Sequence, residues 1–312
     1  MNISVIVPTH NPNAARLQRT LRALRAQSLP AAEWETILVD NASAPALALA
    51  DWTAHGPASL RLVAEPAPGL SHARRRGFLR ATGEFLILVD DDNELAPDYL
   101  AETLRLFAAH PEVGVLGGRS RPEFEQPPEP WVREFDGLIA CRDLGDAPLV
   151  SAGLRNPATG RNDYPMFAPM GAGMALRRAA AQSWLDQGGH AALPDRQGTD
   201  LSSSGDNDIV LAAMTAGWES AYFPTLTLTH LIPQFRTTRD YLGRLNRSLQ
   251  RSWMRVLTRH QANPWPPLAR WSVPVRLARA WLVYRAWSSP AAYVRWQGAC
   301  GHYEGRCADR TP

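Results

Sequence analysis

Three consecutive aspartates, Asp90, Asp91 and Asp92, follow the apolar run at 85–89, and Glu94 comes shortly after them. Neighbouring carboxylates repel each other by about 1 kcal/mol per pair at 4 Å in water, and by more in a partly buried cleft. A divalent cation would offset this repulsion, and hard oxygen ligands suit Mg²⁺ or Mn²⁺. The cluster therefore predicts a carboxylate–metal–diphosphate site. The alternative is a solvated acidic loop after a strand.

Polar residues also follow the other apolar runs in the first part of the chain. They are Pro8, Thr9, His10 and Asn11 after the first run, Asp40 and Asn41 after the second, and Glu65 after the third. Apolar strands separated by helical patterns are typical of a parallel sheet covered on both faces. Ligands of such sheets bind at the carboxyl ends of the strands. We therefore expect these residues to share one site with the aspartates.

The elements that must position this site follow from periodicity and from runs of apolar residues. We expect strands at 3–8, 35–40, 59–65, 84–90, 113–118 and 218–224, and a strand entering a helix at 171–178. We expect helices at 13–27, 69–82, 97–109, 206–216, 239–261 and 275–288. The proline-punctuated segment 119–169 is expected to be a long ordered excursion over a cleft.

The charge is distributed unevenly along the chain. All 33 basic residues are arginines, and residues 236–312 hold 14 of them against three acids, together with six of the 11 tryptophans. Arginines recur at helical spacing in 239–261, which favours contact of 239–288 with an anionic membrane surface. The alternative is a solvated helix face whose leucines pack on the rest of the protein. No nucleic-acid-binding motif is present, so no nucleic-acid partner is expected.

Neither a membrane-spanning run nor a signal peptide is evident in the sequence. We expect a cytoplasmic protein, with peripheral attachment to the inner face of the cytoplasmic membrane as a further expectation. The three cysteines form no CxxC pair, so free thiols are expected, without a disulfide framework or a zinc site.

Six segments resemble the inverting glycosyltransferases of family 2, which have the nucleotide-sugar-binding GT-A fold. They occur in the family's order between Ser4 and about Pro233, and are SVIVPTHN, LVDNAS, GLSHARRRG, LVDDDNELAPDYL, GAGMALRR and SGDNDIVLAAMTAGWESAYFP. The resemblance implies an α/β protein with a Rossmann-like, mostly parallel sheet flanked by helices. Residues 1–118 would bind the nucleotide sugar, 119–235 would supply the acceptor site and catalytic base, and 236–312 would add a basic, Trp-rich helical extension.

The resemblance also implies roles for individual residues. Asp90 and Asp92 would be the D-x-D pair that holds Mg²⁺ or Mn²⁺, with His230 completing the metal shell or contacting the diphosphate. The donor-binding residues would be Pro8, Thr9, Asn11, Asp40, Asn41, Glu65, Arg74, Asp90, Asp91 and Arg236. The acceptor pocket would include Gly171, Ala172 and Gly173, and Trp131 is a candidate platform for an acceptor sugar. Structural roles are the alternatives for Asp40, His230 and Trp131.

The catalytic base has two candidates. The family usually has glutamate then aspartate at this block, and here these positions are Gly205 and Asp206. Asp206 is therefore the first candidate and Asp208 its rival. Asp206 stands at a predicted helix start, where capping of the helix is its alternative role.

The sequence thus predicts a metal-dependent inverting glycosyltransferase. Its donor would be a nucleoside diphosphate sugar, a UDP-sugar first, and its acceptor a hydroxyl of a glycan or a lipid-linked sugar in polysaccharide or surface-glycan assembly. A sugar nucleotidyltransferase is one alternative, although PTHNPNA lacks the glycine-rich basic loop of that class. The other is an inactive glycan- or nucleotide-binding scaffold, which only Gly205 favours.

Overall fold

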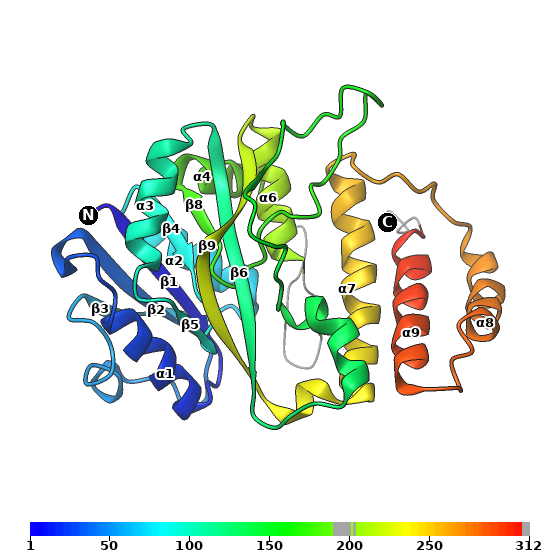
Figure 1. The fold of residues 1–312 in the computed structure, drawn as a ribbon, viewed down its shortest axis with the longest axis horizontal. Helices are drawn as coiled ribbons and strands as arrows, with labels where there is room; N and C mark the ends of the chain where they lie inside the picture. The colour runs from blue at the N-terminus through cyan, green and yellow to red at the C-terminus, as the bar shows by residue number, and fades with distance from the viewer. Residues whose placement is uncertain (190–200, 202–203, 308–312) are drawn as a thin grey trace.

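The computed structural model describes residues 1–189, 201 and 204–307. An α/β body is followed by three long helices that lie in series beyond one side of it (Figure 1). The body is built on one sheet with the strand order β3-β2-β1-β4-β8-β6-β9-β5, and β7 pairs with β9.

The first half of the sheet is parallel, as expected. Its strands are β1 (Ile3–Thr9), β2 (Trp34–Asn41), β3 (Leu60–Glu65) and β4 (Phe85–Leu88). Every residue of β1 and β2 is buried, because helices cover both faces of this half. The carboxyl ends of these parallel strands therefore meet at one edge.

The second half of the sheet is mixed. Its strands are β5 (Asn93–Leu95), β6 (Val113–Phe124), β7 (Leu149–Val150), β8 (Ala175–Arg177) and β9 (Glu219–Ile232). β6 and β9 pair in parallel, whereas β8 runs antiparallel between β4 and β6. Both long strands extend well past the predicted ranges 113–118 and 218–224. The expected α/β fold is confirmed. Strand β6 continues past residue 118, where the sequence placed a functional boundary. The division of the body into a donor-binding part and an acceptor-binding part stays a prediction.

Two groups of helices cover the sheet. The α-helices of the body are α1 (Ala14–Arg25), α2 (Leu70–Arg80), α3 (Tyr99–Ala109), α4 (Arg178–Asp186) and α6 (Gly205–Thr215). Residues of α1 and α3 share one hydrophobic cluster, and those of α2, α4 and α6 share another. Short 3₁₀ segments are η1 (Ala31–Glu33), η2 (Leu49–Asp51), η3 (Pro130–Ile139), η4 (Gln234–Thr237) and η5 (Arg270–Ser272).

The C-terminal region consists of α7 (Arg239–Arg259), α8 (Val273–Val283) and α9 (Pro290–Gly305). α7 lies next to the body, α9 packs on α7, and α8 packs on α9 as the outermost element (Figure 1). The helical extension was predicted, but α9 was not. None of the helices within the described residues is long and apolar enough to cross a membrane.

Candidate active site

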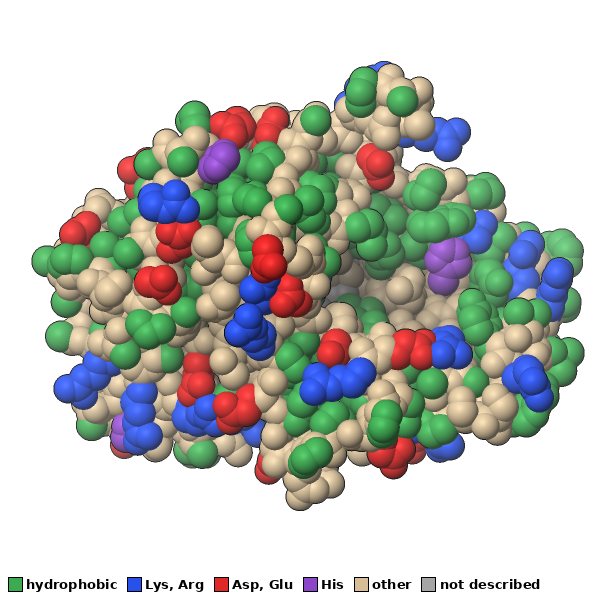
Figure 2. Space-filling model, in the orientation of Figure 1, with side chains coloured by type: hydrophobic (Ala, Val, Ile, Leu, Met, Phe, Trp, Pro, Cys, Tyr) green, Lys and Arg blue, Asp and Glu red, His purple; other side chains and the backbone are tan. Residues whose placement is uncertain are grey.

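A cavity of about 290 Å³ opens at the carboxyl edge of the parallel strands. Its wall combines strand ends of the body with η3 and the first turns of α7, and the surface is hollowed between the body and the C-terminal helices (Figure 2). The predicted residues that line it are Pro8, Thr9, Asn41, Arg74, Asp90, Asp91, Asp92, Gly171, Ala172, Asp206, His230 and Arg236. Positions far apart in the chain are thus brought into one site.

The aspartate triplet forms one wall of the cavity, in the turn between β4 and β5. The backbone N–H of Asn93 donates to the carbonyl of Asp90 at 3.1 Å, which closes this turn. The Thr9 hydroxyl, at the end of β1, donates to the Asp91 carboxylate. Burial and the charge of the adjacent Asp92 raise the pKa of Asp91 to about 7. The repulsion anticipated from the sequence is therefore present in the folded protein.

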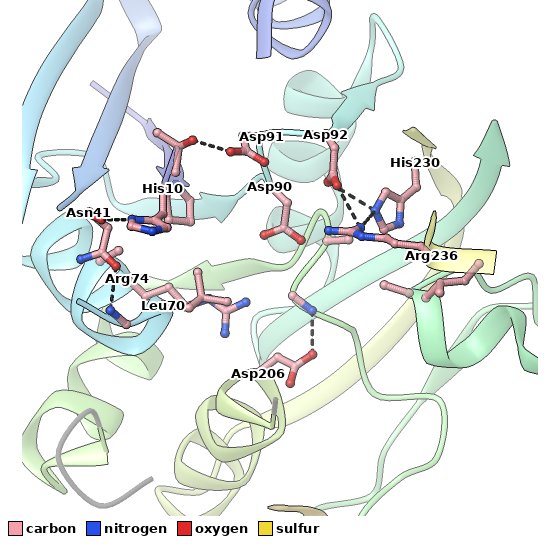
Figure 3. Close-up of a pocket in the computed structure, with 18 of the residues that line it drawn as sticks. His10, Asn41, Leu70, Arg74, Asp90, Asp91, Asp92, Asp206, His230 and Arg236 are labelled. Atoms are coloured by element: carbon pink, nitrogen blue, oxygen red, sulfur yellow. Dashed lines mark hydrogen bonds and ion pairs between the residues drawn. The ribbon is translucent and has the colours of Figure 1, made fainter. Parts of the chain in front are cut away.

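Asp92 belongs to a buried charged group with His230 and Arg236. Its carboxylate lies 3.0 Å from Arg236 Nη1 and 3.3 Å from His230 Nε2. Arg236 Nη1 is also 3.3 Å from the same imidazole nitrogen. The guanidinium therefore sits between the two side chains, as Figure 3 shows. His230 lies in strand β9 and Arg236 lies in η4. Their contacts with Asp92 therefore connect the aspartate turn to residues 230–236.

The chemistry of this group fits a divalent cation. A carboxylate oxygen and an imidazole nitrogen that face the same point are ligands that Mn²⁺ accepts, and phosphate oxygens and water usually complete such a shell. The Arg236 guanidinium occupies that point in this structure, so it would have to move before a cation could bind there. Within the described residues, no group of three or more His, Cys, Asp and Glu side chains could hold a metal by itself. A cation here would therefore depend on ligands from a bound molecule.

Asp206 lies on the opposite wall, across the cavity from Asp90 (Figure 3). It is in the first turn of α6, and the N-cap residue is Ser204. The N–H of Gly171 donates to Asp206 Oδ2 at 3.0 Å, and the N–H of Asn207 donates to Oδ1 at 2.9 Å. These backbone bonds orient the carboxylate, which lines the cavity. Ser204 holds the N-cap position, while Asp206 accepts a first-turn N–H of α6, so its role at the helix start stands beside the predicted role as a base.

Gly171 also brings Arg74 close to Asp206. A Cβ at Gly171 would lie 2.4 Å from Arg74 Nη2 and 3.6 Å from Asp206 Cβ. Arg74 comes from α2, is buried, and extends toward the middle of the cavity (Figure 3). Both side chains thus lie beside position 171, where a Cβ would crowd the Arg74 guanidinium.

The sequence profile of glycosyl transferase family 2 matches residues 4–184, which hold most of this wall. The chain belongs to glycosyl transferase family 2. Relatives include an O-antigen biosynthesis protein from Myxococcus xanthus, 32% identical over 136 residues, which are 39% of this chain and 10% of that protein. A glucosyl-dolichyl phosphate glucuronosyltransferase from Haloferax volcanii is 28% identical over 78 residues, 25% of each chain. The chain thus spans a quarter or less of these relatives.

Solved structures share the fold of this family 2 chain. A mannosyltransferase from Pyrobaculum calidifontis, in complex with GDP-Man and Mn²⁺, superposes with a TM-score of 0.59 at 20% identity, covering 97% of this chain and 87% of that one. The S. aureus protein TarS (residues 1–349) in complex with UDP-GlcNAc superposes with a TM-score of 0.52 at 14% identity, covering 98% and 90%. Both are GT-A glycosyltransferases, so the predicted GT-A architecture is confirmed.

Asp208, the rival to Asp206, points away from the family 2 cavity. It is 1% exposed, and its carboxylate accepts hydrogen bonds from Trp184 Nε1 at 2.7 Å and from Arg259 Nη1 at 3.1 Å. His260 Nε2 lies 2.8 Å away. About half a helical turn separates Asp206 at the cavity wall from Asp208 in the core, where Asp208 ties α6 to α4 and α7. Of the two candidates, Asp206 is the one that lines the cavity.

Five further predicted residues do not line the cavity: Asn11, Asp40, Glu65, Trp131 and Gly173. Both Asp40 oxygens accept backbone N–H groups of the following loop, from Ser43 and Leu47. The Glu65 carboxylate accepts from the Ala67 N–H and from Arg76.

The other three predicted residues outside the cavity also contact neighbouring parts of the protein. Asn11 bridges to the Ser43–Ala44 turn, and the Gly173 carbonyl accepts the Tyr99 hydroxyl. Trp131 packs near Phe135 and donates to Glu129. All five build the surroundings of the site instead of its wall.

Several wall residues were not predicted. They are Pro68, Gly69, Leu70, Ala73, Ile139, Ala140, Tyr241 and Leu245. His10, which the sequence placed at the end of the first strand, lines the cavity as expected, and its Nδ1 lies 2.7 Å from the Asn41 carbonyl oxygen. The contribution of α7 through Tyr241 and Leu245 has no motif in the sequence to indicate it.

Proposed function

We propose that this family 2 protein is a metal-dependent inverting glycosyltransferase. It would move a sugar from a nucleoside diphosphate sugar to a hydroxyl of a glycan or lipid-linked acceptor. The observation that carries the proposal is the placement of Asp206 across one cavity from Asp90 and Asp92. A base and a site for a leaving diphosphate must face each other in a single-displacement reaction.

The donor class is supported by charge and by similar structures. Arg236 and Arg74 bring two guanidinium groups to the cavity, and guanidinium groups bind phosphate oxygens in two-pronged fashion. The similar solved structures are complexes with UDP-GlcNAc and with GDP-Man. A UDP-sugar is the first donor to test.

The metal is supported by the donor set around Asp92. Asp92 and His230 would hold Mg²⁺ or Mn²⁺, with Asp90 within the same wall. When bound, such a cation would neutralise negative charge that develops on the leaving diphosphate. Arg236 would then exchange its contact with Asp92 for the donor phosphates.

In the transfer step, Asp206 would accept the proton of the acceptor hydroxyl. The hydroxyl oxygen would form a bond to the anomeric carbon while the bond from that carbon to the diphosphate oxygen breaks, which inverts the configuration. The backbone N–H groups of Gly171 and Asn207 hold the carboxylate in position for this role. A positioned base of this kind contributes typically 10²–10⁴-fold to a rate.

The acceptor class rests on what the relatives are called. One is an O-antigen biosynthesis protein and another acts on glucosyl-dolichyl phosphate, as its name states. Both names support a saccharide acceptor in surface-glycan or polysaccharide assembly, carried on a lipid in the second case. An acceptor of that kind would place the enzyme at a membrane surface as a peripheral protein.

Donor turnover with Mn²⁺ and with EDTA tests the proposal. We expect sugar release or transfer that needs the metal, and loss of Mn²⁺-dependent donor binding in Asp92→Asn, measured by calorimetry. Asp98→Asn, which changes an exposed aspartate outside the cavity, is the control and should bind donor normally.

Two results would replace the proposal with one of its alternatives. Pyrophosphate release from a nucleoside triphosphate would indicate a sugar nucleotidyltransferase. Binding without turnover of any nucleotide sugar would indicate a scaffold.

A further inference from the structure

The outermost helix, α8, presents an apolar face to solvent. Trp271 in η5 is 82% exposed, and Val275, Leu282 and Val283 are each more than 60% exposed. Trp271, Val275 and Leu282 are spaced by four and by seven residues, which places them along one side of a helix, and Val283 adjoins Leu282. Trp281, on the other side of α8, packs edge-on against Trp296 of α9 with ring centroids 4.7 Å apart. Tyr303 of α9 borders the exposed groove that Trp271, Val275 and Val283 line. Large aliphatic side chains are rarely exposed together in this way.

Arginines alternate with these apolar residues. Arg276 and Arg279 are exposed on the same side of α8, and Arg285 is exposed just after the helix. No ion pair links these three to a carboxylate among the described residues. Residues 241–303 contain no aspartate or glutamate at all. We define the α8 outer face as Trp271, Val275, Arg276, Arg279, Leu282 and Val283.

The long helix α7 packs its apolar face inside the protein. Its apolar residues Leu242, Leu245 and Val256 are buried against the body and α9. Two of its arginines are engaged inside the protein, Arg247 with Glu304 of α9 and Arg259 with Asp208 of α6. Most of the exposed large apolar residues of 239–288 therefore lie in η5, in α8 and just after it.

We propose that the α8 outer face docks on an anionic phospholipid bilayer. Arginines meet the negative headgroups, while Val275, Leu282 and Val283 enter the boundary between headgroups and acyl chains and Trp271 lies at the interface. Hydrophobic and basic side chains gather over α8 at the right-hand edge of the molecule in Figure 2. A nucleic acid would satisfy the arginines and leave the aliphatic side chains in water, so the mixed face favours lipid. The docking does not depend on the reaction proposed above.

Vesicle flotation with the full chain tests this surface. At about 0.1 M salt we expect binding to vesicles of phosphatidylcholine with 30 mol% phosphatidylglycerol, and little binding to pure phosphatidylcholine. Arg276→Gln with Arg279→Gln should weaken binding about 25-fold, about five-fold for each charge. The matched control is Arg25→Gln with Arg80→Gln, exposed arginines of the body, which should bind within two-fold of the parent chain.

A second pair of variants separates insertion from charge. Leu282→Ser should weaken binding about five-fold, whereas Leu79→Ser, at a leucine of α2 that is 53% exposed, should not. Melting temperatures establish that all variants fold.

Three results would overturn the proposal. The first is equal binding to neutral and anionic vesicles, and the second is unchanged vesicle binding by the double arginine variant. The third is the absence of vesicle binding together with RNA binding, or a stable dimer, that depends on the same residues.

Discussion

At the scale of single residues, the candidate site depends on a position that carries no side chain. Gly171 lies beside both the guanidinium of Arg74 and the side chain of Asp206, and its N–H orients the Asp206 carboxylate. The charges reach this point from α2 and α6, two elements that no local sequence pattern connects. Their separation is therefore set by the backbone of the 171 turn.

Gly171→Ala tests this arrangement. The new methyl would lie 2.4 Å from Arg74 Nη2, so the guanidinium must move or the turn must shift. We expect kcat/KM for the proposed transfer to fall at least ten-fold, about 1.4 kcal/mol, with little change in melting temperature.

Gly137→Ala provides the comparison for this variant. Its Cβ meets no atom within 4 Å, and it should keep normal activity. Normal activity in both variants would show that the spacing at position 171 is unimportant.

The position of a residue at the cavity was predictable from the sequence where strand order alone decides it. The aspartate triplet, Thr9 and Asn41 share the cavity because parallel strands end at one edge. Asp40 and Glu65 also end strands, yet their carboxylates close the loops that follow. Whether a strand-end carboxylate faces a ligand or its own loop depends on loop geometry that residue type does not reveal.

At the scale of elements, the contact between α7 and α9 is closer than ordinary helix packing. Gly298, Gly301 and Gly305 line the side of α9 that faces α7, and a Cβ at Gly301 would lie 1.9 Å from the Arg247 carbonyl oxygen. α9 was missed in the sequence because this face is made of small residues, which give no apolar stripe of helical period. Glycine in the interior of a helix also counts against a helix on propensity alone.

Gly301→Ala should therefore destabilise the protein. The methyl would overlap main-chain atoms of Arg247, so α7 and α9 must separate. We expect a loss of about 2 to 3 kcal/mol in the free energy of unfolding, measured by urea denaturation. Gly243→Ala should cost less, because its nearest neighbour is the end of the Tyr293 ring, which can turn aside. A neutral or stabilising Gly301→Ala would contradict the close packing.

At the scale of the whole molecule, the two edges of the sheet, at the carboxyl and amino ends of the parallel strands, differ in what they carry. The carboxyl edge carries the cavity, and the opposite edge carries a buried polar network around Glu35. The Glu35 carboxylate accepts from Ser4 of β1 at 2.7 Å, from Arg61 of β3 at 2.8 Å and from Thr82 at 2.7 Å. Burial raises the pKa of Glu35, but these hydrogen bonds outweigh it and lower the pKa to about 2.

The Glu35 network predicts sensitivity to acid. Because the pKa of Glu35 in the folded protein lies below its ordinary value of 4.5, the stabilisation is complete above about pH 4.5 and is lost as the pH falls toward 2. We expect the ionised Glu35 network to contribute about 3 kcal/mol to the free energy of unfolding at pH 7. Glu35→Gln should therefore be less stable than the parent at pH 7, and this difference should shrink as the pH falls. Urea denaturation at pH 7, 5 and 3 measures this.

Glu84→Gln, at an exposed glutamate nearby, should show a constant difference from the parent across that range. A Glu35→Gln penalty that is the same at every pH would contradict the network.

The most direct test of the account is the rate of sugar transfer by Asp206→Asn at saturating donor, with donor affinity measured on the same preparation. The account predicts unchanged Mn²⁺-dependent donor binding and a rate at least 100-fold lower, because the amide cannot accept the acceptor's proton. Near-normal turnover in this variant would show that the carboxylate facing the aspartate turn is not the base, and the central assignment would be wrong.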